Sequence, residues 1–224
     1  MKKYAIIVAG GLGKRMETEL PKQFLLLNGK PLLYYTIRTF LDGYDDMQLI
    51  LVLPEHHIAA GQEIIDAFFN YDRIQFTQGG RTRFHSVQYG LQLVQEESIV
   101  FVHDAVRCLI SIPLIQRCYE TALAFGTAVP VTDSKDSVRL LVEDGNEALD
   151  RTKVKLVQTP QVFHSKIIKP AFHIAYKEKF TDEATVVEAF GMKVTLVEGD
   201  ENNIKITKAI DLEIAQKLIS NIPQ

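Results

Sequence analysis

Short runs of apolar residues alternate along the chain with segments in which apolar residues recur every three or four positions. The runs predict β-strands at 5–8, 49–53, 74–77, 99–103, 128–131 and 194–197. Several are continuous valine, isoleucine and leucine, which is typical of parallel strands covered on both faces. The periodic segments predict helices at 32–41, 59–69, 84–94, 114–125 and 210–219. This alternation indicates an α/β fold with a doubly wound, mostly parallel sheet.

One segment, residues 134–155, departs from this alternation. Two apolar stretches, 138–142 and 148–149, flank Asp144-Gly145, a dipeptide typical of hairpin turns. We therefore expect a β-arm that projects from the sheet. Since an isolated hairpin is only marginally stable, the arm should pack either against a second subunit or back onto its own domain.

Length and composition set broad limits on the protein. A chain of 224 residues suits a single domain over 1–224 that carries the arm. A net charge of −3 argues against non-specific binding to nucleic acid, which relies on a broad basic surface. Cys108 and Cys118 form no disulfide framework, and no apolar segment has the length of a membrane span. The N-terminus lacks the cleavage region of a signal peptide, so we expect a cytoplasmic location and no membrane partner.

The first predicted strand ends in a glycine-rich turn followed by cations. Residues 9–13 are Ala-Gly-Gly-Leu-Gly, and Lys14, Arg15 and Lys22 come next. Glycines let the backbone approach a ligand closely, and free N–H groups in such a turn bind phosphate oxygens. The spacing fits neither a P-loop nor the Gly-x-Gly-x-x-Gly fingerprint of dinucleotide-binding proteins. Cations at fixed distances supply charge where phosphate charge develops, so the turn predicts nucleotide phosphate chemistry.

Three more polar segments, 79–86, 103–107 and 198–205, follow other predicted strands. Because ligands of open α/β sheets bind beyond the carboxyl ends of the strands, we expect all four segments to meet at one edge. Asp104 ends its strand and is a candidate ligand of Mg²⁺, although a turn aspartate is the commoner use. Residues 181–183, Thr-Asp-Glu before an apolar stretch, predict the start of a further helix.

Taken in order, these segments resemble the sugar- and polyol-phosphate cytidylyltransferases, and most closely those that act on 2-C-methyl-D-erythritol 4-phosphate in the nonmevalonate isoprenoid route. The resemblance covers nearly the whole chain and is carried by residues 9–16, 21–24, 79–87, 103–107, 150–151, 158–161, 181–184 and 203–207. It implies a Rossmann-like nucleotidyltransferase fold and transfer of CMP from CTP to the polyol phosphate, with release of pyrophosphate. It also implies a homodimer whose arms are exchanged.

The same resemblance implies roles for particular residues. The triphosphate, the transition state and the attacking phosphate would be held by three catalytic cations, Arg15, Lys22 and Lys205. Cytidine would be lined by Ala9, Gly10, Gly11, Gly80, Arg81, Ser86 and Ala105. The polyol phosphate would contact Arg107, Thr181, Lys205 and the partner's Arg151. The expected cofactor is Mg²⁺ or another divalent cation, held by Asp104.

Three alternative functions stay open at this point. Ribitol-5-phosphate cytidylyltransferases share the scaffold, although residues 150–151 and 181–184 favour methylerythritol phosphate. Guanylyltransferases of the molybdenum-cofactor type share the glycine-rich opening. A non-catalytic nucleotide-binding regulator is the third, because Asn202 stands where many family members have an aspartate. Cations placed as for a transition state argue against that third alternative.

Overall fold

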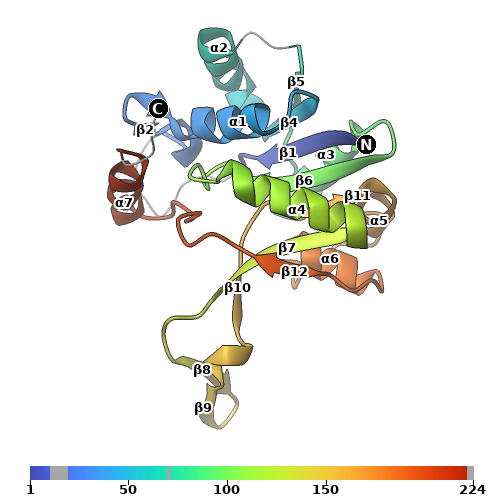
Figure 1. Cartoon of the computed structure of the whole chain (residues 1–224), viewed down its shortest axis with the longest axis vertical. Helices are drawn as coiled ribbons and strands as arrows, with labels where there is room; N and C mark the ends of the chain where they lie inside the picture. Colours follow the sequence, from blue (N-terminus) through green and yellow to red (C-terminus); the bar gives the residue numbers. More distant parts are fainter. Residues whose placement is uncertain (11–19, 70–71, 221–224) are drawn as a thin grey trace.

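The computed structural model describes residues 1–10, 20–69 and 72–220. In that part of the chain eight strands form one sheet in the order β10-β7-β11-β6-β1-β4-β5, with β12 beside β7 (Figure 1). Their bounds are β1 Lys2–Val8, β4 Met47–Leu53, β5 Ile74–Gln78, β6 Ser98–Asp104, β7 Thr127–Asp133, β10 Lys155–Val157, β11 Gln161–His164 and β12 Leu196–Glu198. A short antiparallel pair, β2 (Leu26–Leu27) and β3 (Lys30–Pro31), is separate from this sheet.

Most neighbouring strands of the main sheet run parallel. β1 pairs in parallel with β4 and β6, β4 pairs in parallel with β5, and β12 pairs in parallel with β7. Strands β10 and β11 are antiparallel to their neighbours. The predicted mostly parallel sheet is therefore confirmed, and every predicted strand is present, with the last one shifted to begin at Leu196. The apolar pattern does not predict β10 and β11, because both are short and neither is a long apolar run.

Helices separate the strands as the periodicity predicts. Their bounds are α1 Leu32–Gly43, α2 Ile58–Phe68, α3 Arg83–Gln92, α4 Ile112–Phe125, α5 Ser165–Ala171, α6 Glu183–Ala189 and α7 Ala209–Ser220. Three 3-10 turns accompany them, η1 Lys22–Phe24, η2 Glu55–His57 and η3 Arg151–Lys153. Only α5 has no counterpart among the predicted helices. No helix in these described segments combines the length and the apolar character needed to cross a membrane.

Both faces of the sheet are buried. Ala5 and Ile7 of β1 face a core shared with α1, α2 and α4, through residues such as Leu33, Ile64 and Leu114. The alternate residues Tyr4 and Ile6 face a second core shared with α3, α5 and α6, through residues such as Val87, Ile168 and Val187. Because side chains alternate along a strand, apolar residues at successive positions require this two-sided cover. The doubly wound arrangement is thus confirmed.

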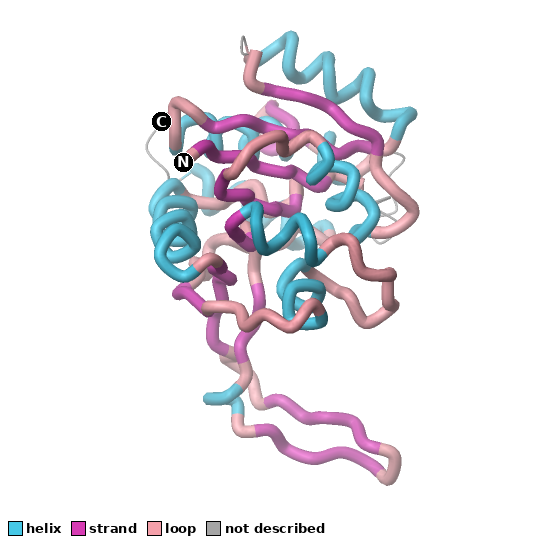
Figure 2. The backbone as a smooth tube through the Cα atoms, turned by 90° about the vertical axis from the view of Figure 1, so that its right-hand side faces the viewer, coloured by secondary structure: helices cyan, strands magenta, loops and turns pink. Residues whose placement is uncertain are grey.

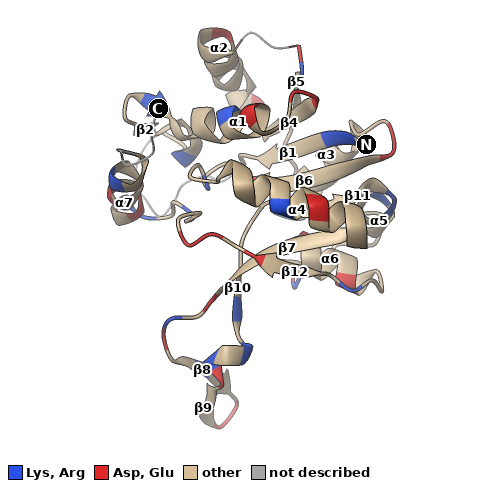
Figure 3. Cartoon of the chain, in the orientation of Figure 1, with Lys and Arg blue, Asp and Glu red and all other residues tan. Residues whose placement is uncertain are grey.

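The predicted arm is present and extends away from the rest of the chain. Strands β8 (Val138–Val142) and β9 (Gly145–Leu149) form their own antiparallel pair, with Val142 opposite Gly145 at the tip. Figures 1 and 2 show this hairpin beyond the edge of the main sheet, connected through β10 and η3. Within the described part of the chain it projects rather than folding back onto the domain, and the Leu141 side chain is 83% exposed. Figure 3 shows that basic residues also gather near η3.

Candidate active site

The carboxyl end of β6 positions the acidic centre of the site. Asp104, its last residue, is buried, and its Oδ1 accepts a hydrogen bond from Arg83 Nε at 3.1 Å. Its Oδ2 lies 2.7 Å from Lys205 Nζ, and its backbone N–H donates to Thr159 Oγ1 at 3.1 Å. Burial alone would raise the pKa of the Asp104 carboxyl, but Arg83 and Lys205 outweigh it and hold that pKa well below its usual range. Asp104 is therefore an ionised carboxylate between two cations.

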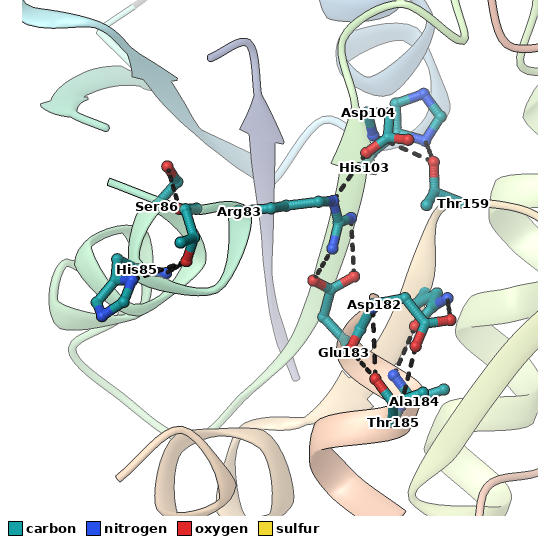
Figure 4. Close-up of polar contacts among 12 residues, drawn as sticks. Arg83, His85, Ser86, His103, Asp104, Thr159, Asp182, Glu183, Ala184 and Thr185 are labelled. Atoms are coloured by element: carbon teal, nitrogen blue, oxygen red, sulfur yellow. Dashed lines mark hydrogen bonds and ion pairs between the residues drawn. The ribbon is translucent and has the colours of Figure 1, made fainter. Parts of the chain in front are cut away.

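Arg83 connects Asp104 to the start of α6. Its guanidinium pairs with both carboxylate oxygens of Glu183, and Nη2 lies 3.0 Å from Oε2 (Figure 4). Glu183 is 1% exposed. Asp182 caps α6 by accepting a hydrogen bond from the backbone N–H of Thr185 at 3.0 Å, so the predicted helix start is present and its cap is Asp182.

Two lysines that lie far apart in the sequence meet at residues 203–207. Lys205 pairs with Asp104, as described above, and Lys22 Nζ donates to the carbonyl oxygen of Thr207. The N–H of Ile206 donates to the carbonyl of Val106 at 3.0 Å, which fastens this segment to the turn after β6. The structure thus pairs Lys205 with Asp104 and places the Lys22 ammonium on the backbone two residues beyond Lys205. Lys14, Arg15 and Gly11 lie outside the described residues.

The loop after β5 is shaped by a serine. Ser86 Oγ accepts the backbone N–H of Gly80 at 3.1 Å and donates to the carbonyl of Thr82 at 3.1 Å. A Cβ added at Gly80 would lie 2.4 Å from Cβ of His85, so glycine is required at this turn. Arg81 follows and is exposed.

Gly10 lies next to this loop, and Ala9 and Ala105 directly follow the ends of β1 and β6. The N–H of Ala9 donates to Val52 and that of Ala105 donates to Val8, so both extend the sheet beyond the strand ends. A Cβ added at Gly10 would lie 4.0 Å from Ser86 Oγ, which places Gly10 against the serine loop. These residues form a lining of small side chains and backbone at the carboxyl edge, where the sequence predicts a nucleoside.

The residues predicted for the polyol phosphate are only partly brought together. Arg107 follows Asp104 and donates from Nη1 to the carbonyl of Asn203 at 2.7 Å, and burial lowers the pKa of its guanidinium. Thr181 is exposed directly before the start of α6. Arg151 lies on η3 of the arm and donates to the carbonyl of Lys135 at 2.9 Å, and Figure 1 shows the arm extending away from β6.

Residues 158–161 brace the site, a role that the sequence pattern does not reveal. Gln158 accepts the N–H of Asp200 at 3.1 Å and donates to the carbonyl of Asp200 at 2.8 Å. Thr159 accepts from Asp104, as above, and its hydroxyl lies 3.1 Å from Nδ1 of buried His103. Gln161 donates to Asp182 Oδ2 at 2.8 Å. Uncharged polar residues in a short segment give no periodic signal, so only the match to a family motif singles them out.

Asp104 is the carboxylate at this site that suits a divalent cation. Mg²⁺ is commonly bound by one or two carboxylates together with waters and substrate phosphates, so a single ionised aspartate beside a triphosphate fits it. Asp200 bonds to Ser111 and to the N–H of Asn202, and Glu201 pairs with Lys135. No cluster of three or more metal-ligating side chains occurs among the residues whose positions are given.

Comparison with known proteins shows which family the chain belongs to. Residues 4–221 match the family model described as IspD, 2-C-methyl-D-erythritol 4-phosphate cytidylyltransferase. The chain belongs to this family. It is 45% identical over 219 residues to the 2-C-methyl-D-erythritol 4-phosphate cytidylyltransferase of Phocaeicola vulgatus, an alignment covering 98% of this chain and 100% of the relative. The match to an IspD relative favours this family over the ribitol phosphate and guanylyltransferase alternatives.

Solved IspD structures share the fold. The 4-diphosphocytidyl-2C-methyl-D-erythritol synthase of Anaerococcus prevotii superposes with a TM-score of 0.86 at 28% identity, covering 98% of this chain and 96% of that one. The IspD of Francisella tularensis superposes with a TM-score of 0.79 at 31% identity, covering 97% of this chain and 99% of the other. The α/β nucleotidyltransferase fold extends over the whole length of these relatives.

Proposed function

We propose that this chain transfers CMP from CTP to 2-C-methyl-D-erythritol 4-phosphate and releases pyrophosphate, a step of nonmevalonate isoprenoid biosynthesis. The observation that carries the proposal is that, in an IspD family member, Lys205 pairs with Asp104 at the end of β6 while Lys22 donates to the carbonyl of Thr207, two residues beyond Lys205. An oxygen of the substrate phosphate attacks the α-phosphorus of CTP, and the bond to pyrophosphate breaks. The enzyme needs no covalent nucleophile, because the phosphate monoester already is one.

The chemical difficulty is that two anions must meet, so catalysis rests on positioning and on charge neutralisation. Arg15 and Lys22 act on the triphosphate and stabilise the charge of the transition state. Lys205 holds the attacking phosphate, and its 45% exposed side chain leaves it within reach of that group. Arg107 and Thr181 are its neighbours on the polyol-phosphate side.

The nucleoside is held by small residues and backbone. The lining is formed by Ala9, Gly10, Gly11, Gly80, Arg81, Ser86 and Ala105. The support for this assignment is that Ser86 Oγ binds the N–H of Gly80 and faces Gly10, so that glycines and a small side chain lie together at this edge. Asp104 would hold Mg²⁺ together with phosphate oxygens of CTP, and the bound ion would neutralise charge on the triphosphate.

The proposed enzyme is a homodimer that exchanges its arms. Leu140, Leu141 and Val142 expose apolar side chains on the projecting hairpin, and a second copy would cover them. Exchange would bring Arg151 to the site of the other subunit. We place the enzyme in the cytoplasm, where the buried free thiols of Cys108 and Cys118 would stay reduced.

A pyrophosphate-release assay with Mg²⁺ tests the reaction. Each of CTP, GTP, ATP and UTP is paired with methylerythritol phosphate or with ribitol 5-phosphate. We expect turnover with CTP and methylerythritol phosphate, and a loss of about a hundredfold or more in Lys22→Ala, while Lys30→Ala serves as the matched control outside the site. Preferred turnover of ribitol 5-phosphate would reassign the substrate. CTP binding without pyrophosphate release on either polyol phosphate would indicate a regulator.

A further inference from the structure

We propose that Arg83 and Glu183 are positioning residues, which lock the Asp104 carboxylate to the start of α6 and so fix the nucleotide side of the site against the polyol-phosphate side. The inference rests on the proposed function, because only in that reaction does Asp104 serve the nucleotide while Thr181 serves the polyol phosphate. None of the roles assigned above involves Arg83 or Glu183.

The contacts of Arg83 use its planar guanidinium in two directions. Nε donates to Asp104 Oδ1 at 3.1 Å, while Nη1 and Nη2 donate to the two oxygens of Glu183. A rigid fork with donors on two sides fixes the distance and the angle between two carboxylates. A lysine at position 83 carries the same charge but cannot span them in this way. Arg83 therefore determines where Asp104 lies relative to α6.

The far end of this connection is itself fixed. Glu183 is the first residue of α6, and Asp182 caps that helix. Gln161 of β11 accepts the N–H of Ala184 at 2.8 Å and donates to Asp182 Oδ2 at 2.8 Å. Since β11 pairs directly with β6, α6 is fastened to the strand that ends in Asp104. Thr181 precedes the cap residue Asp182, so the anchored start of α6 also fixes the position of Thr181.

The distribution of exposure explains why a second cation is needed beside Asp104. The Lys205 side chain is 45% exposed, whereas the side chains of Arg83 and Glu183 are 26% and 1% exposed. Lys205 is open to an incoming phosphate, while the more buried Arg83 holds Asp104. A buried ion pair is poor evidence for stability, because well-packed apolar residues of similar volume are often as stable. The buried charges of Arg83 and Glu183 therefore point to a role in the reaction.

Two sets of variants separate positioning from charge and from folding. Arg83→Lys keeps the charge and loses the span, and Arg83→Met/Glu183→Leu replaces the buried pair with apolar side chains. We expect each to lower kcat by about tenfold or more, with the Kd for CTP, measured by equilibrium titration, changed by less than about threefold. The unfolding midpoint of the double variant should stay close to that of the wild type. Glu188→Gln, on the same helix and exposed, is the matched control.

A double-mutant cycle tests whether Glu183 acts through Asp104. Glu183→Gln should slow the wild-type enzyme but add less than about a twofold loss in the Asp104→Asn background. Additive losses, or wild-type kcat in Arg83→Lys and in the folded double variant, would overturn the positioning role. A wild-type protein inactive with CTP and both polyol phosphates would instead overturn the proposed function, so the two failures are distinguishable.

Discussion

The ammonium of Lys205 lies 2.7 Å from Oδ2 of Asp104, and this ion pair joins the segment after β12 to the end of β6. The two partners differ in exposure, since the Asp104 side chain is 10% exposed and that of Lys205 is 45% exposed. The buried carboxylate thus holds a half-exposed cation at the edge of the sheet. A phosphate that arrives from solvent meets a lysine that is already oriented, with less side-chain entropy to lose on binding.

Replacing Lys205 should impair the reaction far more than the fold. We expect Lys205→Ala to lower kcat by about a hundredfold or more, equivalent to roughly 3 kcal/mol of transition-state stabilisation. Stability should change little, because Arg83 still pairs with Asp104. Steady-state kinetics and thermal unfolding measure the two effects, with exposed Lys208→Ala as the control. Wild-type kcat in a folded Lys205→Ala enzyme would remove Lys205 from the scheme.

The serine loop after β5 should not tolerate a side chain at Gly80. An added Cβ would meet His85 Cβ at 2.4 Å and the His85 carbonyl carbon at 2.9 Å, so the loop must shift. We expect Gly80→Ala to raise KM for CTP by about tenfold or more, since a displaced hydrogen-bond donor left unpaired costs about 1–3 kcal/mol. Gly43→Ala, whose Cβ would meet Ile115 at an ordinary 3.8 Å, is the control. An unchanged KM would show that this loop does not hold the nucleotide.

The exchange of arms predicts complementation between two inactive variants. In a mixed dimer of Arg151→Ala and Lys205→Ala subunits, one site would keep its own Lys205 and receive an intact Arg151 from the other chain. Unfolding and refolding the two variants together should restore roughly a quarter of wild-type activity, because about half of the dimers are mixed and half of their sites are intact.

The controls for complementation are each variant refolded alone and the two mixed without unfolding. If Arg151 served its own chain's site, every site in a mixed dimer would carry one defect and activity would stay at the level of the single variants. Light scattering on the wild type independently checks that the species is a dimer. A monomer at the concentrations of the assay would contradict the proposed exchange.

The sequence predicts the fold well because periodicity reports burial. Continuous apolar runs such as 49–53 belong to strands covered on both faces, and both cores contact β4 there. The sheet edge at which the polar segments lie can also be predicted, because the sequence shows where the apolar runs end and the polar segments begin. The dipeptide Asp144-Gly145, which is typical of hairpin turns, likewise predicts the position of the arm. Local sequence patterns of this kind therefore predict the topology.

Contacts between distant side chains are less accessible to such reasoning. Nothing near Arg83 in the sequence indicates that it spans Asp104 and Glu183, because these partners come together only after the sheet and α6 have packed. Gln158 and Thr159 are similar, since their hydrogen bonds go to backbone groups of remote segments. Strand β11 was not predicted, because four residues are too few to show an alternating pattern.

Acid should destabilise the protein through His103. Its imidazole is fully buried, with Nε2 3.2 Å from the Arg107 carbonyl and Nδ1 3.1 Å from Thr159 Oγ1. Burial lowers the pKa of His103 to about 3 from an ordinary value of 6.5. The folded state therefore favours the neutral ring, and this contribution is fully present above pH 6.5 and is lost progressively as the pH falls from 6.5 towards 3.

Chemical denaturation at several pH values measures this loss. Across that window the free energy of unfolding should fall by about 1.4 kcal/mol per pH unit from this one group. His103→Asn should be less stable at neutral pH but should show a slope smaller by that amount, whereas His173→Asn, at an exposed site, should keep the wild-type slope. Ring ¹⁵N shifts should show a neutral His103 at pH 5. A protonated ring in the folded protein at that pH would contradict the argument. It would mean that the carbonyl of Arg107 and the hydroxyl of Thr159 accept the two ring protons at no cost to the free energy of folding.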